Sequence, residues 1–158
     1  MPIPKISTDE VKVTQFAPHG RVDIAMDGDV LQYTCTGPFN KELFDCMAVT
    51  QAAMLRSLER TGPWASIATF VGSAMCPPDG IQRYTELIQT QLPPEQTPVA
   101  TAFVVGPDIE GGRIMESHFT GIFASIGRPF AVFSTMAEAR DWVQPLLDAN
   151  RAPREPKP

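Results

Sequence analysis

The stretch that most constrains the fold lies near the C-terminus, at residues 128–143 (RPFAVFSTMAEARDWV). Phe130–Phe133 is short, apolar and aromatic, which is typical of an interior strand. Thr135 and Glu138 have the spacing of a capping box, in which a hydroxyl accepts a hydrogen bond from a backbone amide of the first helical turn. Ser134 is an equally acceptable cap. The stretch therefore predicts a strand that leads directly into a helix.

The predicted terminal helix carries one apolar stripe that needs a sheet to cover it. The stripe consists of Ala139, Trp142, Val143 and Leu146. Pro145 has no amide hydrogen to donate to residue 141, so we expect the helix to end or kink near Gln144. If Trp142 is buried, its replacement by Ala would lower the free energy of unfolding by about 3–5 kcal/mol.

The preceding chain supplies the other layers of the fold. Apolar or alternating runs predict four further strands, at residues 22–26, 31–35, 64–71 and 99–105. Amphipathic stretches predict three further helices, at residues 41–60, 78–91 and 113–126. The first two strands flank Asp27, Gly28 and Asp29, a short Gly-containing loop that favours an antiparallel hairpin.

This order predicts an α/β fold with a mixed sheet of about five strands, opened by an antiparallel hairpin, and about four helices. We expect a single domain over residues 20–150. A loose arm should precede it at residues 1–19, with an added edge strand at 10–16. The tail at residues 151–158 is rich in proline and is expected to be disordered.

Composition excludes several functional classes. The net charge of −5 and the dispersed basic residues argue against a nucleic-acid partner. Three cysteines, Cys35, Cys46 and Cys76, lack metal-ligand spacing and favour a reducing compartment. No stretch approaches the roughly 20 apolar residues of a membrane span, and no cofactor motif is present. We therefore expect a cytoplasmic protein without a membrane span, metal or cofactor.

The hairpin, the alternation of strands and helices, and the final segment together resemble the STAS fold. The likeness is closer to the bacterial SpoIIAA-like group of STAS/SEC14-type proteins, and the topology covers about residues 20–147. The motif that carries it consists of Phe133, Ala139, Trp142 and Val143. The resemblance implies a non-enzymatic domain that acts through protein–protein interaction. We expect such a protein to self-associate, as a homodimer.

The resemblance also implies a phosphorylation site. In the anti-sigma-factor antagonist branch, a Ser or Thr in the turn after the central strand is phosphorylated by a partner kinase. The corresponding turn here is at residues 70–75, where only Ser73 fits that role. The Asp that precedes the phosphorylated residue in the family is absent.

Two side chains raise the alternative of an enzyme. Cys76 precedes a predicted helix, where a thiol can have a lowered pKa, and is the candidate reactive thiol. Arg83 follows it with six intervening residues, one more than in a phosphatase loop. His118 lies beside the apolar stripe of its predicted helix, as a packed histidine or as a functional one.

A loop after the strand at 99–105 is the candidate ligand site. It contains Asp108, Gly111, Gly112 and Arg113, with His118 one to two turns further on. Such a loop lies at the carboxyl edge of the sheet, where open α/β sheets bind ligands. A further alternative is a carrier of a small apolar or lipid-like ligand, held between the helices and the sheet and gated by Phe119 and Phe123.

Overall fold

The computed structural model describes residues 4–58 and 60–151. Within them lie six strands: β1 (Lys5–Ser7), β2 (Arg21–Asp27), β3 (Val30–Thr36), β4 (Ala65–Val71), β5 (Thr101–Val104) and β6 (Phe130–Phe133). Four α-helices lie between or after them: α1 (Lys41–Ser57), α2 (Pro78–Gln89), α3 (Gly112–Ser125) and α4 (Met136–Ala149). Two short 3-10 helices, η1 (Thr8–Glu10) and η2 (Pro94–Gln96), complete the fold.

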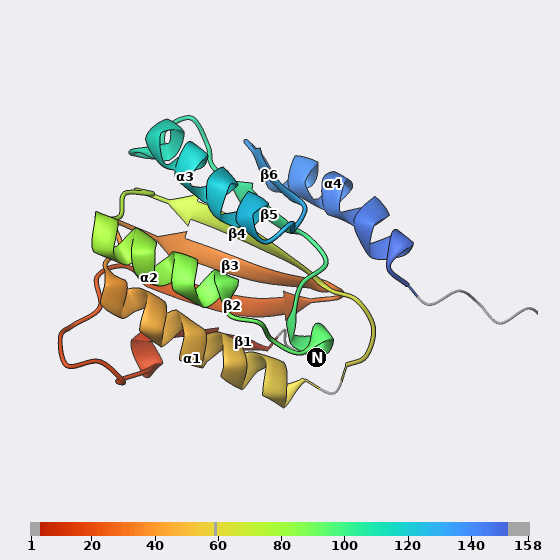
Figure 1. Ribbon diagram of the computed structural model, residues 1–158, viewed down its shortest axis with the longest axis horizontal. Coiled ribbons are helices and arrows are strands. Elements are labelled where there is room, and N and C mark those ends of the chain that lie inside the picture. The colour runs from red at the N-terminus through yellow and green to blue at the C-terminus, as the bar shows by residue number, and fades with distance from the viewer. Residues whose placement is uncertain (1–3, 59, 152–158) are drawn as a thin grey trace, which may run out of the picture.

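The strands form one sheet in the order β1-β2-β3-β4-β5-β6 (Figure 1). The first three strands pair antiparallel, and β3 to β6 pair parallel. The predicted hairpin is confirmed, with Asp27 opposite Val30 and Gly28 in the left-handed region at φ 60°. The α/β fold with a mixed sheet is also confirmed. The described sheet has six strands rather than about five, because β1 adds to its edge.

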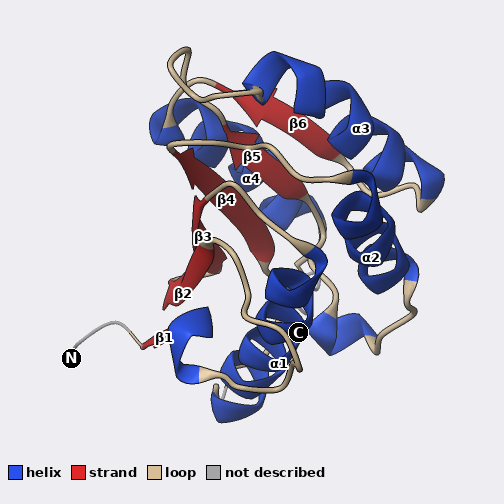
Figure 2. Cartoon of the chain, turned by 90° about the vertical axis from the view of Figure 1, so that its left-hand side faces the viewer, coloured by secondary structure: helices blue, strands red, loops and turns tan. Residues whose placement is uncertain are grey.

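The helices divide between the two faces of the sheet. In Figure 2, α1, α2 and α3 lie along one face, and α4 lies against the other. The core is divided in the same way. The larger cluster includes Ile24 and Leu31 of the hairpin with Leu43 and Phe123 of the helices. A smaller cluster joins β4 and β5 to Ala139, Val143 and Leu147 of α4.

The N-terminal arm is partly ordered, in contrast to the predicted loose segment. Lys5–Ser7 pairs with β2, and the Thr8 hydroxyl, which is buried, accepts a hydrogen bond from the Val22 amide at 3.0 Å. The added edge strand therefore lies before residues 10–16, which form no strand. The predicted tail beyond Arg151 lies outside the described residues.

The capping of α4 agrees with the sequence, but its length does not. Thr135 is the N-cap, and its hydroxyl oxygen accepts from the Glu138 amide at 3.3 Å. The helix does not end near Gln144, because it continues through Pro145 to Ala149. Pro145 deprives only the carbonyl of Asp141, a residue exposed to water, and the continued helix buries Leu147 on the sheet.

The buried stripe of α4 is accordingly shifted from the predicted one. Ala139, Val143 and Leu147 are almost completely buried, whereas Leu146 is half-buried. Trp142 is also half-buried, with its ring 5.7 Å from that of Phe133. Replacing Trp142 by Ala should therefore lower the free energy of unfolding by less than the loss of about 3–5 kcal/mol expected for a fully buried ring.

None of the helices in the described part of the chain combines the length and the apolar run that crossing a membrane requires.

The continuation of α4 past Pro145 can be tested by two neighbouring substitutions. Leu147→Ala should lower the free energy of unfolding by about 2–5 kcal/mol, because it removes a fully buried side chain. Leu146→Ala should lower it by about 1 kcal/mol, as is usual for a partly exposed position. Urea denaturation followed by circular dichroism measures both values. Equal losses would contradict a helix that carries Leu147 into the core.

Candidate functional site

A cavity of about 700 Å³ separates the sheet from the three helices on its larger covered face. Its floor is formed by β3, β4 and β5, and α1, α2 and α3 form its walls. The floor side chains in β4 and β5 include Ser66, Ala68 and Thr101, which are too small to fill the space beneath the helices. A gap in an otherwise close-packed layer follows from these small side chains.

Most of the cavity wall is apolar. Aromatic side chains come from every layer: Tyr33, Phe39, Phe44, Phe70, Tyr84, Phe103, Phe119 and Phe123. The rings contact one another, with centroids 5.0 Å apart for Phe70 and Phe103 and 5.1 Å apart for Phe44 and Tyr84. Met47, Leu87 and Ile88 add flexible aliphatic surface. Such a lining suits a ligand with an apolar body.

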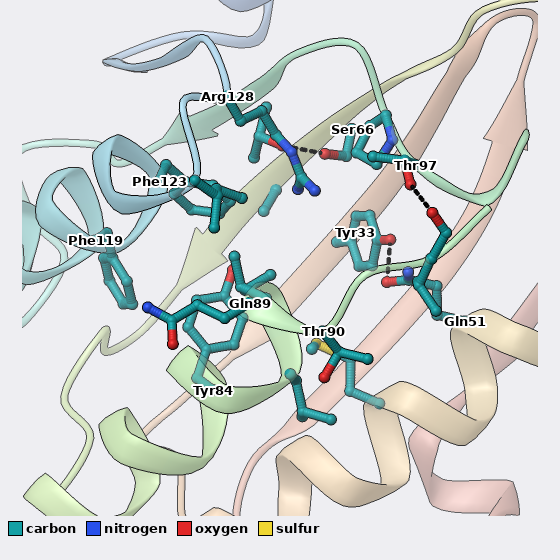
Figure 3. A pocket seen from close by; sticks show the side chains of 18 of the residues that line it. Tyr33, Gln51, Ser66, Tyr84, Gln89, Thr90, Thr97, Phe119, Phe123 and Arg128 are labelled. Carbon is teal, nitrogen blue, oxygen red and sulfur yellow. Dashed lines mark hydrogen bonds between the residues drawn. The ribbon is translucent and has the colours of Figure 1, made fainter. Parts of the chain in front are cut away.

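The mouth of the cavity lies at the amino ends of the parallel strands. It is lined by the segment that connects α2 to β5, including Gln96 and Thr97, and by the turn Gly127–Pro129 before β6. This edge is opposite to the carboxyl edge, where the sequence placed its ligand loop. Figure 3 shows side chains from both segments around the opening.

Polar groups line part of the cavity. The Tyr33 hydroxyl donates to Oε1 of Gln51 at 2.7 Å, and the hydroxyls of Ser66 and Thr101 share a hydrogen bond of 2.8 Å. Burial raises the pKa of Tyr33 and of Tyr84. Both phenols are therefore neutral, and both can act as hydrogen-bond donors.

Arg128 brings a positive charge to the cavity. Its guanidinium carbon lies 5.6 Å from the centroid of the Phe123 ring, a cation–π distance. Figure 3 shows the side chain pointing from the turn before β6 into the space beside Phe123 and Tyr33. Burial lowers the pKa of Arg128, while the nearby phenols of Tyr84 and Tyr33 act in the opposite direction. An arginine keeps its charge in proteins even so.

Ser73, the candidate phosphorylation site, is buried at the carboxyl edge. Its hydroxyl donates to the Glu110 carboxylate at 3.0 Å and accepts from the Met75 amide at 3.1 Å. Ser73 and Glu110 also form an isolated parallel bridge, with Ala74 donating to the Glu110 carbonyl at 2.9 Å. Ser73 therefore joins the loop after β4 to the loop after β5.

The glycines of the predicted ligand loop have a packing role. Gly111 has φ of 71°, and a Cβ there would lie 2.1 Å from Sδ of Met75. A Cβ on Gly112 would lie 2.7 Å from a methyl carbon of Val105. Asp108 and Arg113 are exposed near these glycines. The structure thus places the loop where the sequence did, and close packing accounts for its glycines.

Cys76 and Arg83 do not form a joint site. Burial, with the negative charge of Asp79, raises the pKa of the Cys76 thiol to about 12, opposite to the direction expected before a helix N-terminus. Arg83 instead donates to Asp45 at 2.6 Å and to Glu86 at 3.2 Å. Near neutral pH, Cys76 therefore stays protonated.

His118 lies on the exposed side of α3, away from the buried stripe of that helix. It is neither packed in the core nor part of the cavity lining, in contrast to Phe119 next to it. Among residues 4–58 and 60–151, no three His, Cys, Asp or Glu side chains are grouped as metal ligands.

Sequence reasoning missed the residues that give the cavity its polarity. Ser66 and Thr101 are polar positions inside otherwise apolar strands, and Arg128 is a cation directly before the last strand. These departures from the apolar pattern were the available signals. Phe119 and Phe123, named as gates of an apolar ligand site, do line the cavity.

The chain was compared with protein-family models, curated proteins and solved structures, and none of them matches it.

The raised pKa of Cys76 predicts slow alkylation at neutral pH. Only the thiolate reacts, so the rate at Cys76 should rise about tenfold per pH unit without levelling off near pH 9. An ordinary thiol, with a pKa of about 8.5, levels off there. Asp79→Asn should speed the reaction, because it removes a charge that raises the pKa. Peptide mapping after iodoacetamide labelling measures the rate. A plateau below pH 9 in the parent protein would refute the raised pKa.

Proposed function

We propose that this protein binds a small ligand with an apolar body in the cavity between the sheet and helices α1, α2 and α3. The single observation that carries this proposal is the cavity of about 700 Å³ with its aromatic wall. Ligand cavities in proteins are typically about 300–1,000 Å³ and largely apolar. A carrier or a ligand-sensing domain would use such a site.

The shape of the fold supports the proposal. The cavity floor consists of β-strands paired on both sides, β3 to β5, so the backbone there is held by the sheet. The segment from Thr90 to Val99 spans the mouth and contains only the short helix η2. A rigid floor with a connecting segment at the mouth gives a preformed site and an entry path for a ligand.

The protein-interaction role implied by the STAS resemblance stays a prediction. The phosphorylation version of that role meets an obstacle at Ser73, which is 5% exposed and bonded to Glu110. A kinase would first have to separate the two loops that this contact joins. A phosphate at Ser73 would also be repelled by the Glu110 carboxylate.

Filling the cavity tests the proposed function. Ala68→Phe places a ring on the cavity floor and should weaken binding of Nile red, an uncharged apolar probe, by roughly tenfold. This loss corresponds to about two buried methylene groups at about 0.8 kcal/mol each. Fluorescence titration measures the affinity, and circular dichroism confirms that the variant is folded.

Ala25→Phe is the matched control, because Ala25 lies on the opposite face of the same sheet and should leave binding unchanged. If Ala68→Phe does not fold, Gln96→Trp at the mouth replaces it, with Glu95→Trp as its neighbour outside the lining. The proposal fails if the parent protein binds no Nile red, or if the cavity variant and its control bind equally well.

A further inference from the structure

Within the described residues, the only charge on the cavity lining is positive. Among its 29 lining residues, all from the described part of the chain, Arg128 is the only one with a charged side chain, and Asp and Glu are absent. The whole chain has 18 acidic residues against 13 basic ones. None of the described acidic residues lines this cavity. The cavity is therefore a locally positive site in an acidic protein.

In the described part of the chain, Arg128 also has no carboxylate as a counter-ion. Within residues 4–58 and 60–151, the guanidinium forms no ion pair and its side chain makes no hydrogen bond. Arg21, Arg60, Arg83, Arg140 and Arg151 each pair with at least one carboxylate. The Phe123 ring stabilises the charge of Arg128 but accepts none of the bonds that the planar guanidinium can donate in parallel.

Two further donors face the same space. Tyr84 is buried, lines the cavity, and its hydroxyl has no hydrogen-bond partner among the described residues. The Ser66 and Thr101 hydroxyls share one hydrogen bond, which uses one of their two protons and leaves the other available. The polar part of the cavity thus offers donors, and the groups it lacks are negatively charged acceptors.

We propose that the cavity binds an amphipathic monocarboxylate, with its carboxylate on Arg128 and its apolar body among Phe70, Phe103 and Phe119. This inference rests on the proposed function and adds the chemical class of the ligand. One guanidinium matches one carboxylate in charge and in its two-point geometry. The hydroxyls of Tyr84 and of the Ser66–Thr101 pair donate to the carboxylate oxygens that remain.

Two probes of equal chain length distinguish the contribution of the carboxylate to binding from that of the apolar tail. Decanoate and decanol share the same tail, and isothermal titration calorimetry measures the affinity of each. The parent protein should bind decanoate about 10- to 30-fold more tightly, the gain expected from charge-assisted hydrogen bonds to a desolvated guanidinium. Arg128→Met should remove this preference and leave decanol binding within about twofold.

Arg113→Met is the matched control, since it removes the same charge from an exposed position outside the cavity. It should keep the preference for decanoate. Arg128→Lys retains the charge but loses the planar fork, so it should bind decanoate with intermediate affinity. It also serves as the test variant if Arg128→Met does not fold.

Each outcome decides one of the two proposals. Equal binding of decanoate and decanol by the parent protein, or an equal loss of both in Arg128→Met, overturns the carboxylate inference while the apolar site stands. If Arg113→Met loses the preference as well, the effect is one of overall charge, and the inference also fails. If the parent protein binds no Nile red, the proposed function itself is wrong.

Discussion

The small side chains on the helix-facing side of β4 and β5 are the constraint on which the rest of this structure depends. Ser66, Ala68 and Thr101 lie where three helices cover the parallel strands. On the opposite face, Ile67 and Val104 of the same strands are buried against α4. One face of the sheet is therefore filled, and the other retains a cavity of about 700 Å³.

The packed parts of the fold are therefore distinct from the part that is open to a ligand. The α4 face is closed by apolar contacts and by ion pairs to the hairpin turn, from Arg140 to Asp27 at 3.0 Å and from Arg151 to Asp29 at 2.8 Å. The carboxyl edge is closed by the bond from Ser73 to Glu110. The amino edge keeps an opening lined by Arg128, whose guanidinium forms no ion pair with any described residue.

The sequence was sufficient for those features that depend on local pattern. Thr135 is a helix cap as predicted, the hairpin turns at Gly28, and Phe130–Phe133 joins the sheet. The sequence predicted that the last helix would end or kink near Gln144; it does not end there, because burial of Leu147 outweighs the loss of one helical hydrogen bond. The position of Cys76 before a helix also did not indicate the direction of its pKa, which burial and the charge of Asp79 raise.

The cavity was beyond sequence reasoning for a physical reason. It exists because residues from three strands and three helices leave a space between them. The sequence of any one of these segments cannot predict that space. Tyr33, Tyr84 and Phe119 have the pattern of ordinary core residues, and only their arrangement makes them a lining. The loop from Asp108 to Arg113 was predicted as a ligand site because of its glycines. Close packing against Met75 and Val105 explains why glycine stands at these positions.

The most direct test of this account is a crystal structure of the protein soaked with a terminally brominated decanoate, with the bromine located by its anomalous scattering. The account predicts a bromine peak among Phe70, Phe103 and Phe119, with the carboxylate on the Arg128 guanidinium. A peak at the loop from Asp108 to Arg113, or a cavity filled by its own side chains with the bromine elsewhere, would contradict it.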